Sequence, residues 1–287
     1  MELPRPGNLS TYQLINYTLY LADNSLILGH RNSEWCGHGP VLEQDIAITN
    51  ISLDLIGQSR NFYQYAARLI NAQKALPLQS LSKDGEGVGF AIGTPMATEG
   101  GEVSEDSLAY FRNSNYFKNI LLVELPKGDW AHTILRQFFF SAFQNLLYEN
   151  LKESKDEQVA AIATKALKEI AYHLRWSSEW VIRLGDGTGD SHSRMIRAID
   201  ALWGYTDEMF VPASYEIELM MDIGINISRL KENWLQKVTT IFDEATLAVP
   251  ARSSVFTGGK EGNHSEHLDH VLKELQSVAR AHPTATW

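Results

Sequence analysis

The sequence predicts an all-α protein in which four long helices form a bundle and additional helices follow toward the C-terminus. Apolar residues recur at helical spacing in long segments along most of the chain. The first two segments are separated by a short break, which is typical of antiparallel neighbours in a bundle. One short apolar stretch, residues 88–94, could form a strand, but the chain offers no partner strands for a sheet.

The first two long helices are predicted from the break between them. Helical periodicity extends from about residue 10 to residue 32 and stops at the segment Trp35–Pro40, which contains two glycines. Pro40 is suited to the first turn of the next helix, which is expected to end near Asn71. At 1.5 Å per residue this second helix is ~45 Å long, well above the globular average.

The later helices are predicted from their end signals. Asp129 is a good N-cap for the third long helix, Trp130–Glu153, because its carboxylate can accept the free N–H groups of the first turn. The fourth, about Asp156–Leu184, is followed by Gly185, a common helix terminator. Shorter helices are expected at 105–114, 191–210, 228–248 and 265–279.

A stretch rich in glycine and proline interrupts the helical pattern at about residues 77–104. Such punctuation is typical of loops, so this stretch is predicted to be a surface insertion. We find no internal repeat and no block of like charges that would divide the chain. Residues 1–287 are therefore predicted to form a single helical domain.

Composition restricts the function classes. The net charge of −10, with 25 basic among 35 acidic residues, disfavours nucleic acid, which needs clustered Lys and Arg. No apolar run is long enough for a membrane helix, and Glu2, Pro4 and Pro6 are not typical of a secretory signal. Cys36 is the only cysteine, so no disulfide forms within the chain, and a cytoplasmic location is expected.

Helix bundles often carry chemistry on inward-facing polar groups. In di-iron carboxylate bundles two helices each supply a Glu and two others each supply Glu-x-x-His, because residues three apart share a face. The second long helix has Asp54 with Gly57 three residues later. The fourth has Glu169 and His173, but they are four apart rather than three.

The other two long helices add little to such a site. No acid lies between Asp129 and Glu149 on the third helix, whose central inward candidates are Gln137, Ser141 and Gln144. Only Asp23 is an acid near the middle of the first helix.

The sequence therefore predicts no catalytic residue, no cofactor and no functional metal site. Asp54, Glu169 and His173 are interpreted as vestigial di-iron-type positions that form a polar cluster held by hydrogen bonds. Glu169 and His173 can also bond each other as i, i+4 neighbours.

Several further features could carry function. The run from His264 to His270 could bind a metal through His267 and His270, or could be a polar helix start capped by Ser265. Gly258–Lys260 and Gly85–Gly89 lack the frames of phosphate-binding and dinucleotide-binding loops. Cys36 has only His38 nearby, a poor catalytic base in a turn. Five tryptophans are expected in the core or, where exposed, at an interface: Trp176, Trp180, Trp203, Trp234 and Trp287.

Local strings resemble the PaaC family, one of the components of bacterial phenylacetyl-CoA 1,2-epoxidase (phenylacetate-CoA oxygenase). They lie at residues 34–40, 50–62, 168–175, 244–247 and 257–268, so the resemblance spans nearly the whole chain. It is less close at the N-terminus and in the glycine-rich stretch, which is longer than is usual in the family.

The resemblance implies a ferritin-like fold and a structural, non-catalytic subunit that supports a related di-iron catalytic subunit in a hetero-oligomer. That complex epoxidises the ring of phenylacetyl-CoA during aerobic phenylacetate degradation. Two alternatives stay open, namely an oxygenase subunit with a remodelled metal site and an acyl-CoA-binding subunit. The sequence also leaves a homodimer open.

Overall fold

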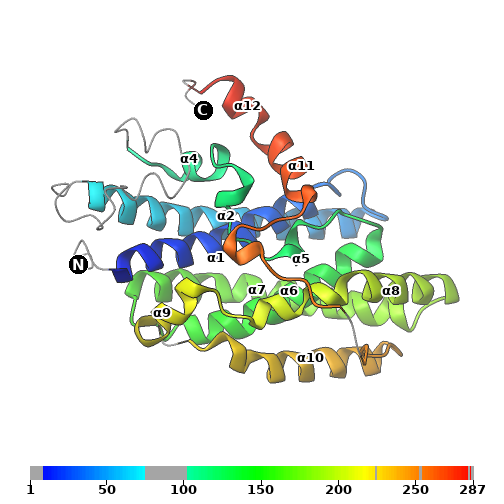
Figure 1. Cartoon of the computed structure of the whole chain (residues 1–287). Coiled ribbons are helices and arrows are strands. Elements are labelled where there is room, and N and C mark those ends of the chain that lie inside the picture. The colour runs from blue at the N-terminus through cyan, green and yellow to red at the C-terminus, as the bar shows by residue number, and fades with distance from the viewer. Residues whose placement is uncertain (1–8, 75–101, 224, 252–253, 284, 286–287) are drawn as a thin grey trace.

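The computed structural model describes residues 9–74, 102–223, 225–251, 254–283 and 285 of the 287-residue chain. Four long helices dominate it, and the described residues contain no strand. They are α1 (Leu9–Ser33), α2 (Leu42–Lys74), α6 (Trp130–Leu151) and α7 (Glu157–Gly185) (Figure 1). The predicted all-α, ferritin-like bundle is confirmed.

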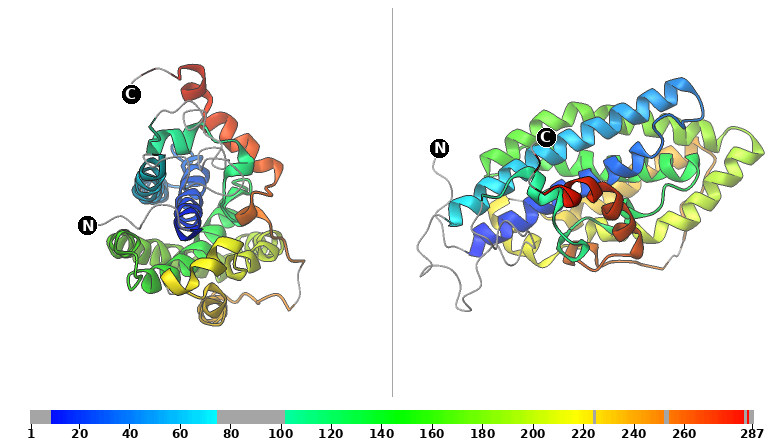
Figure 2. Two further views of the ribbon diagram at one scale, coloured as in Figure 1. Left: turned by 60° about the vertical axis from the view of Figure 1, so that its left-hand side comes forward. Right: turned by 90° about the horizontal axis from the view of Figure 1, so that it is seen from above.

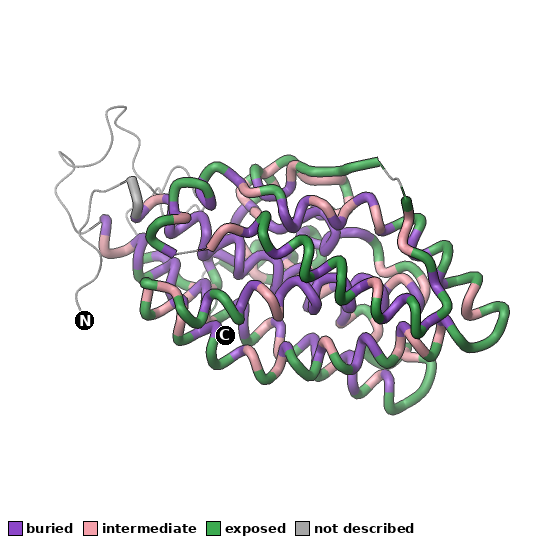
Figure 3. Tube along the Cα trace, turned by 90° about the horizontal axis from the view of Figure 1, so that it is seen from below, coloured by how far each residue is buried: buried purple, intermediate pink, exposed green. Residues whose placement is uncertain are grey.

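The bundle has two layers. α1 packs along α2, and α6 packs along α7, so each layer is one long hairpin. The nearly end-on view in Figure 2 shows the α1–α2 layer lying against the α6–α7 layer, with α10 (Leu230–Glu244) on the outer side of the second layer. Buried positions follow the middle of the bundle, and exposed positions follow its outer turns (Figure 3).

The turn between α1 and α2 differs in one detail from the prediction. Pro40 does not open the second helix, which begins at Leu42. The Asp45 carboxylate accepts a hydrogen bond from the Gly39 N–H at 2.9 Å, which ties the turn to the helix start. Gly37 has a φ of 77°, a left-handed conformation that favours glycine. The turn therefore ends two residues later than the proline alone suggests.

The predicted cap of α6 is confirmed, and the structure adds a cap to α7 that we did not predict. The Asp129 side chain accepts a hydrogen bond from the His132 N–H at the start of α6. Asp156 caps α7 in the same way by accepting from the Val159 N–H. At the other end of α7, a Cβ on Gly185 would lie 2.4 Å from the Ala245 carbonyl oxygen, so this glycine permits close packing against the end of α10.

The shorter helices follow the predictions less closely. The helix expected at 191–210 is α8 (Gly189–Leu202) followed by two 3₁₀ turns, η4 (Trp203–Tyr205) and η5 (Asp207–Phe210). The helix expected at 265–279 is two helices, α11 (Glu266–Leu275) and α12 (Ser277–Ala281). The helix expected at 105–114 ends early, as α4 (Glu105–Tyr110), and is followed by η3 (Ser114–Tyr116). The helix expected at 228–248 is η6 (Ile227–Arg229) followed by α10, which ends at Glu244. Elements that we did not predict are α5 (Leu121–Glu124), α9 (Ser214–Ile223) and η7 (Gly259–Glu261).

The glycine-rich stretch predicted at 77–104 lies outside the described residues except for its last three positions. There, the Asn71 side chain at the end of α2 bonds both the N–H and the carbonyl of Val103. The chain therefore resumes against the end of α2 and enters α4.

An aromatic cluster fills the space between α6, α8 and α10. Trp234 is buried and donates its indole N–H to the Phe139 carbonyl at 3.0 Å. Phe139 and Trp203 pack against it with ring centroids at 5.6 and 5.8 Å, and Phe242 packs against these two rings at 6.1 and 6.4 Å. Trp176 is also buried, whereas Trp287 lies outside the described residues. Trp176 and Trp234 therefore belong to the core, and Trp180 and Trp203 are half-buried against it.

Candidate functional site

A chain of amides and one carboxylate crosses the bundle between α2, α6 and α7. Gln58 of α2 is buried and donates to the Glu169 carboxylate of α7 at 2.9 Å. Its carbonyl oxygen accepts from the Gln144 amide of α6 at 3.1 Å. Burial raises the pKa of Tyr148, beside Gln144, to about 12, which keeps this phenol neutral. Three of the four long helices are thus joined by neutral amides and a single carboxylate.

A second contact lies one helical turn away. His173 of α7 is fully buried, and its Nε2 lies 3.0 Å from Oδ2 of Asp54, whose side chain is 35% exposed. Asp54 and Gln58 are one turn apart on α2, and their partners follow in the opposite order on α7, as antiparallel helices require. Nδ1 of His173 has no hydrogen-bond partner among the described residues.

These contacts show the partners of the three predicted residues, Asp54, Glu169 and His173. Glu169 and His173 do not bond each other as neighbours on α7, because each instead reaches across to α2. The three residues therefore divide between two separate contacts, Asp54 with His173 and Glu169 with Gln58. Gly57 does not face the interior at all, since it is exposed and a Cβ built on it would meet nothing within 4 Å. Gln58, one residue later, occupies the inward position.

The one acid near the middle of α1 is already neutralised by a cation. Asp23 is fully buried and forms an ion pair with the equally buried Arg112, which follows α4. Its carboxylate also accepts from the Tyr63 hydroxyl at 2.5 Å and from the Lys118 N–H at 2.8 Å. No local pattern in the sequence pointed to Arg112, because it lies 89 residues from Asp23 on a different element.

The inward candidates on α6 are buried, as expected, and bond only to neutral groups. Gln137 accepts from the Asn32 amide of α1 at 2.6 Å and donates to the Ser141 hydroxyl at 2.7 Å. Together with Gln144, these side chains line the middle of α6 without a charge.

The donor set does not fit a di-iron centre. Such a centre needs four carboxylates and two imidazoles from facing helices. Here the middle of the bundle offers the Asp54–His173 pair, Glu169 bound to an amide, and Asp23 bound to Arg112. Within the described part of the chain, no three His, Cys, Asp or Glu side chains gather closely enough to hold a metal ion. Side-chain amides and hydroxyls occupy the remaining polar positions in the middle of the bundle instead.

Comparison with known proteins identifies the family. The model of a family described as phenylacetic acid catabolic protein, PaaA_PaaC, matches residues 5–287. The chain belongs to this family. It is also similar to the C component of 1,2-phenylacetyl-CoA epoxidase from Escherichia coli (strain K12), with 42% identity over 276 residues, covering 96% of this chain and 99% of that protein. The family assignment agrees with the resemblance carried by the local sequence strings.

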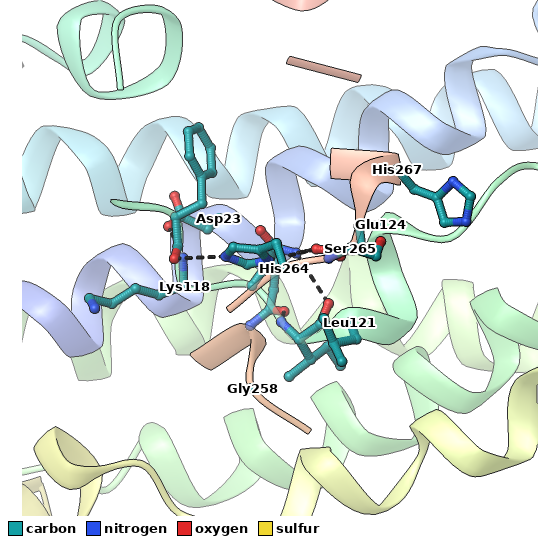
Figure 4. Close-up of polar contacts among 12 residues, drawn as sticks. Asp23, Lys118, Leu121, Glu124, Gly258, His264, Ser265 and His267 are labelled. Carbon is teal, nitrogen blue, oxygen red and sulfur yellow. Dashed lines mark hydrogen bonds and ion pairs between the residues drawn. The ribbon is translucent and has the colours of Figure 1, made fainter. Parts of the chain in front are cut away.

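Residues 257–268, one of the strings that resemble the family, make buried contacts with the rest of the protein. His264 lies with its side chain buried between the Glu124 carboxylate of α5, at 2.7 Å, and the Phe117 carbonyl, at 3.0 Å. Figure 4 shows His264 and Ser265 beside Glu124, with His267 pointing away from them. Burial opposes a charge on His264, but the hydrogen bond and negative charge of Glu124 outweigh it and raise the pKa of the imidazole.

The two candidate interpretations of His264–His270 both need correction. Ser265 stands at the N-cap position of α11, but its hydroxyl donates to Glu124 at 2.7 Å and makes no capping hydrogen bond. The metal interpretation rested on His267 and His270, but no set of three His, Cys, Asp or Glu side chains that could hold a metal ion gathers in the described part of the chain. His264 is turned into the protein, and His270 is exposed. The run attaches the C-terminal helices to α5.

The Gly258–Lys260 segment likewise belongs to the protein interior. Lys260 is buried and pairs with Glu216 of α9 at 2.9 Å, and it also donates to the Val211 carbonyl. A Cβ on Gly259 would lie 2.3 Å from the Asn119 carbonyl oxygen, so only glycine fits there. The lysine is therefore unavailable to a phosphate.

Cys36 shows no activated thiol. It is exposed, with Sγ 3.1 Å from the Thr49 hydroxyl, and Nδ1 of His38 contacts its carbonyl oxygen rather than its sulfur. The Gly85–Gly89 segment lies outside the described residues. None of the described helices combines the length and the apolar character that crossing a membrane requires.

Proposed function

We propose that this chain is a structural, non-catalytic subunit of a multicomponent phenylacetyl-CoA ring epoxidase, bound to a di-iron catalytic subunit in the cytoplasm. Membership of the family and the similarity to an epoxidase component support the pathway and the complex. The pairing of the interior carboxylates with other side chains supports the non-catalytic role.

The observation that carries this proposal is the pair of cross-helix contacts between α2 and α7. Asp54 is paired with His173, and Glu169 is bound by Gln58. A metal ligand must offer its lone pairs to the ion, whereas Glu169 and Asp54 offer theirs to side chains of the neighbouring helix. These contacts join α2 to α7 and α6, so the same positions that would perform oxygen chemistry in a di-iron subunit here hold the scaffold together.

Reconstitution tests the proposal. The catalytic subunit from the same organism is purified with and without this chain, and epoxidation of phenylacetyl-CoA is measured with the reductase present. We expect the two chains to co-purify and activity to require both. Full activity of the catalytic subunit alone would contradict a supporting role.

A second candidate function, binding of an acyl-CoA, has one observation in its favour. A surface groove of about 380 Å³ between α6, α7 and α10 places Arg175 and Lys237, together with one acid, Glu179, beside apolar side chains of Leu174, Ile182 and Ile241. Cationic groups next to an apolar floor suit a phosphorylated thioester. Titration of the isolated chain with phenylacetyl-CoA discriminates the two, because the structural role predicts no saturable binding.

A further inference from the structure

The outer surface of α2 carries an apolar stripe that the described part of the chain leaves uncovered. Val41, Leu42, Ile46 and Leu53, here called the α2 apolar face, each expose between 50% and 71% of their surface. Leu42, Ile46 and Leu53 are spaced so that they fall on one side of the helix. Clustered exposed aliphatic side chains on a soluble protein are typical of a protein–protein contact.

Gly57 continues the stripe one turn beyond Leu53. It lies in the interior of a 33-residue helix, where glycine is less favourable than any other residue except proline. Nothing in the described part of the chain requires it, because a Cβ at this position would meet no atom within 4 Å. A bare backbone on an exposed helix face is useful where another chain approaches closely.

The chain segment that carries this face has charges of one sign, although Arg31 already pairs with Glu34 at its edge. Residues 34–59 contain four acidic residues, Glu34, Glu43, Asp45 and Asp54, and neither Lys nor Arg. The first basic residue of α2 is Arg60, which pairs with Glu105. A partner that covers the apolar face therefore meets carboxylates at its edges and is complementary if it presents Lys or Arg there.

We propose that the α2 apolar face and Gly57 form the docking surface for the catalytic subunit, which presents an apolar ridge edged by basic side chains. This inference rests on the function proposed above. A second copy of this chain fits less well. Full overlap of two identical apolar faces would bring Glu43, Asp45 and Asp54 of both copies into one interface with no basic residue from 34–59 to offset them.

Three variants of the full-length chain test the inference by their affinity for the purified catalytic subunit. Ile46→Asp combined with Leu53→Asp places charges in the apolar face, and we expect at least tenfold weaker binding. Gly57→Leu adds a better helix former and a bulky side chain. We expect it to raise the thermal midpoint of the isolated chain and to weaken binding, which separates docking from folding. Ile217→Asp on α9, similarly exposed at 55%, is the matched control and should bind as the wild type does.

The outcomes separate this inference from the proposed function. If the wild type binds the catalytic subunit and both α2 variants bind equally well, the surface is assigned wrongly while the proposed function stands. Equal weakening by the Ile217→Asp control would also overturn the assignment, because the effect would not be specific to α2. If the wild type shows no binding at all, the proposed function fails and this inference fails with it.

Discussion

Replacing Arg112 with methionine tests whether the central acid of α1 is structural. The variant removes the cation that neutralises Asp23, and both side chains are fully buried. Breaking a buried ion pair costs about 3–5 kcal/mol, because the remaining charge is left uncompensated. Asp23 keeps hydrogen bonds from the Tyr63 hydroxyl and the Lys118 N–H, so we expect the lower end, about 3 kcal/mol.

Urea denaturation of the isolated chain, followed by circular dichroism, measures this loss, and the thermal midpoint should fall by roughly 6–12 °C. Arg60→Met is the matched control, because Arg60 pairs with Glu105 at 3.4 Å on the surface and should cost less than about 1 kcal/mol. Asp23→Leu combined with Arg112→Met should be less destabilised than the sum of the two single variants. A loss below about 1 kcal/mol for Arg112→Met would refute the reasoning, since it would mean that Asp23 does not depend on this cation.

Two further predictions concern the segment that attaches the C-terminal helices. His264 has a higher pKa in the folded protein, so its contact with Glu124 stabilises fully below about pH 6.5, the unfolded value, and is lost as the pH rises through the folded pKa. Unfolding free energies from pH 5.5 to 9 should therefore converge between wild type and His264→Gln at high pH, and a constant difference would contradict this. Gly259→Ala should cost about 1–3 kcal/mol because its Cβ meets the Asn119 carbonyl, whereas Gly189→Ala, with open space, should cost nothing in the same denaturation assay.

The long helices were predictable because their signals are local. An apolar period sustained over more than twenty residues, with Asp129 as the cap of α6 and Gly185 at the end of α7, fixes both helices within two residues at each end. Short elements such as α5, with four residues, carry too few periods to be recognised. α9 was missed although it has ten residues, and η4 and η5 replaced the end of a predicted helix. α5 and α9 pack against α1, which is distant from them in sequence, so local sequence does not encode their contacts.

The candidate site was predictable in most of its residues, but neither Gln58 nor the pairings were predicted. Spacing alone identified Asp54, Glu169 and His173 as the candidates, and showed that a carboxylate–imidazole set was incomplete. Which residue bonds which depends on the register of α2 against α7, and that register is set by packing across the whole interface. The same limit applies to Arg112, whose partner is distant in sequence.

The most direct test of the central claim keeps the scaffold and removes the acids that could bind metal. Asp54→Asn and Glu169→Gln are combined, since the new amide oxygens can still accept from His173 and Gln58. The variant is assembled with the wild-type catalytic subunit, and iron per complex and epoxidation rate are measured. A structural role predicts wild-type iron content and rate. Loss of iron and activity from a complex that still assembles would contradict it.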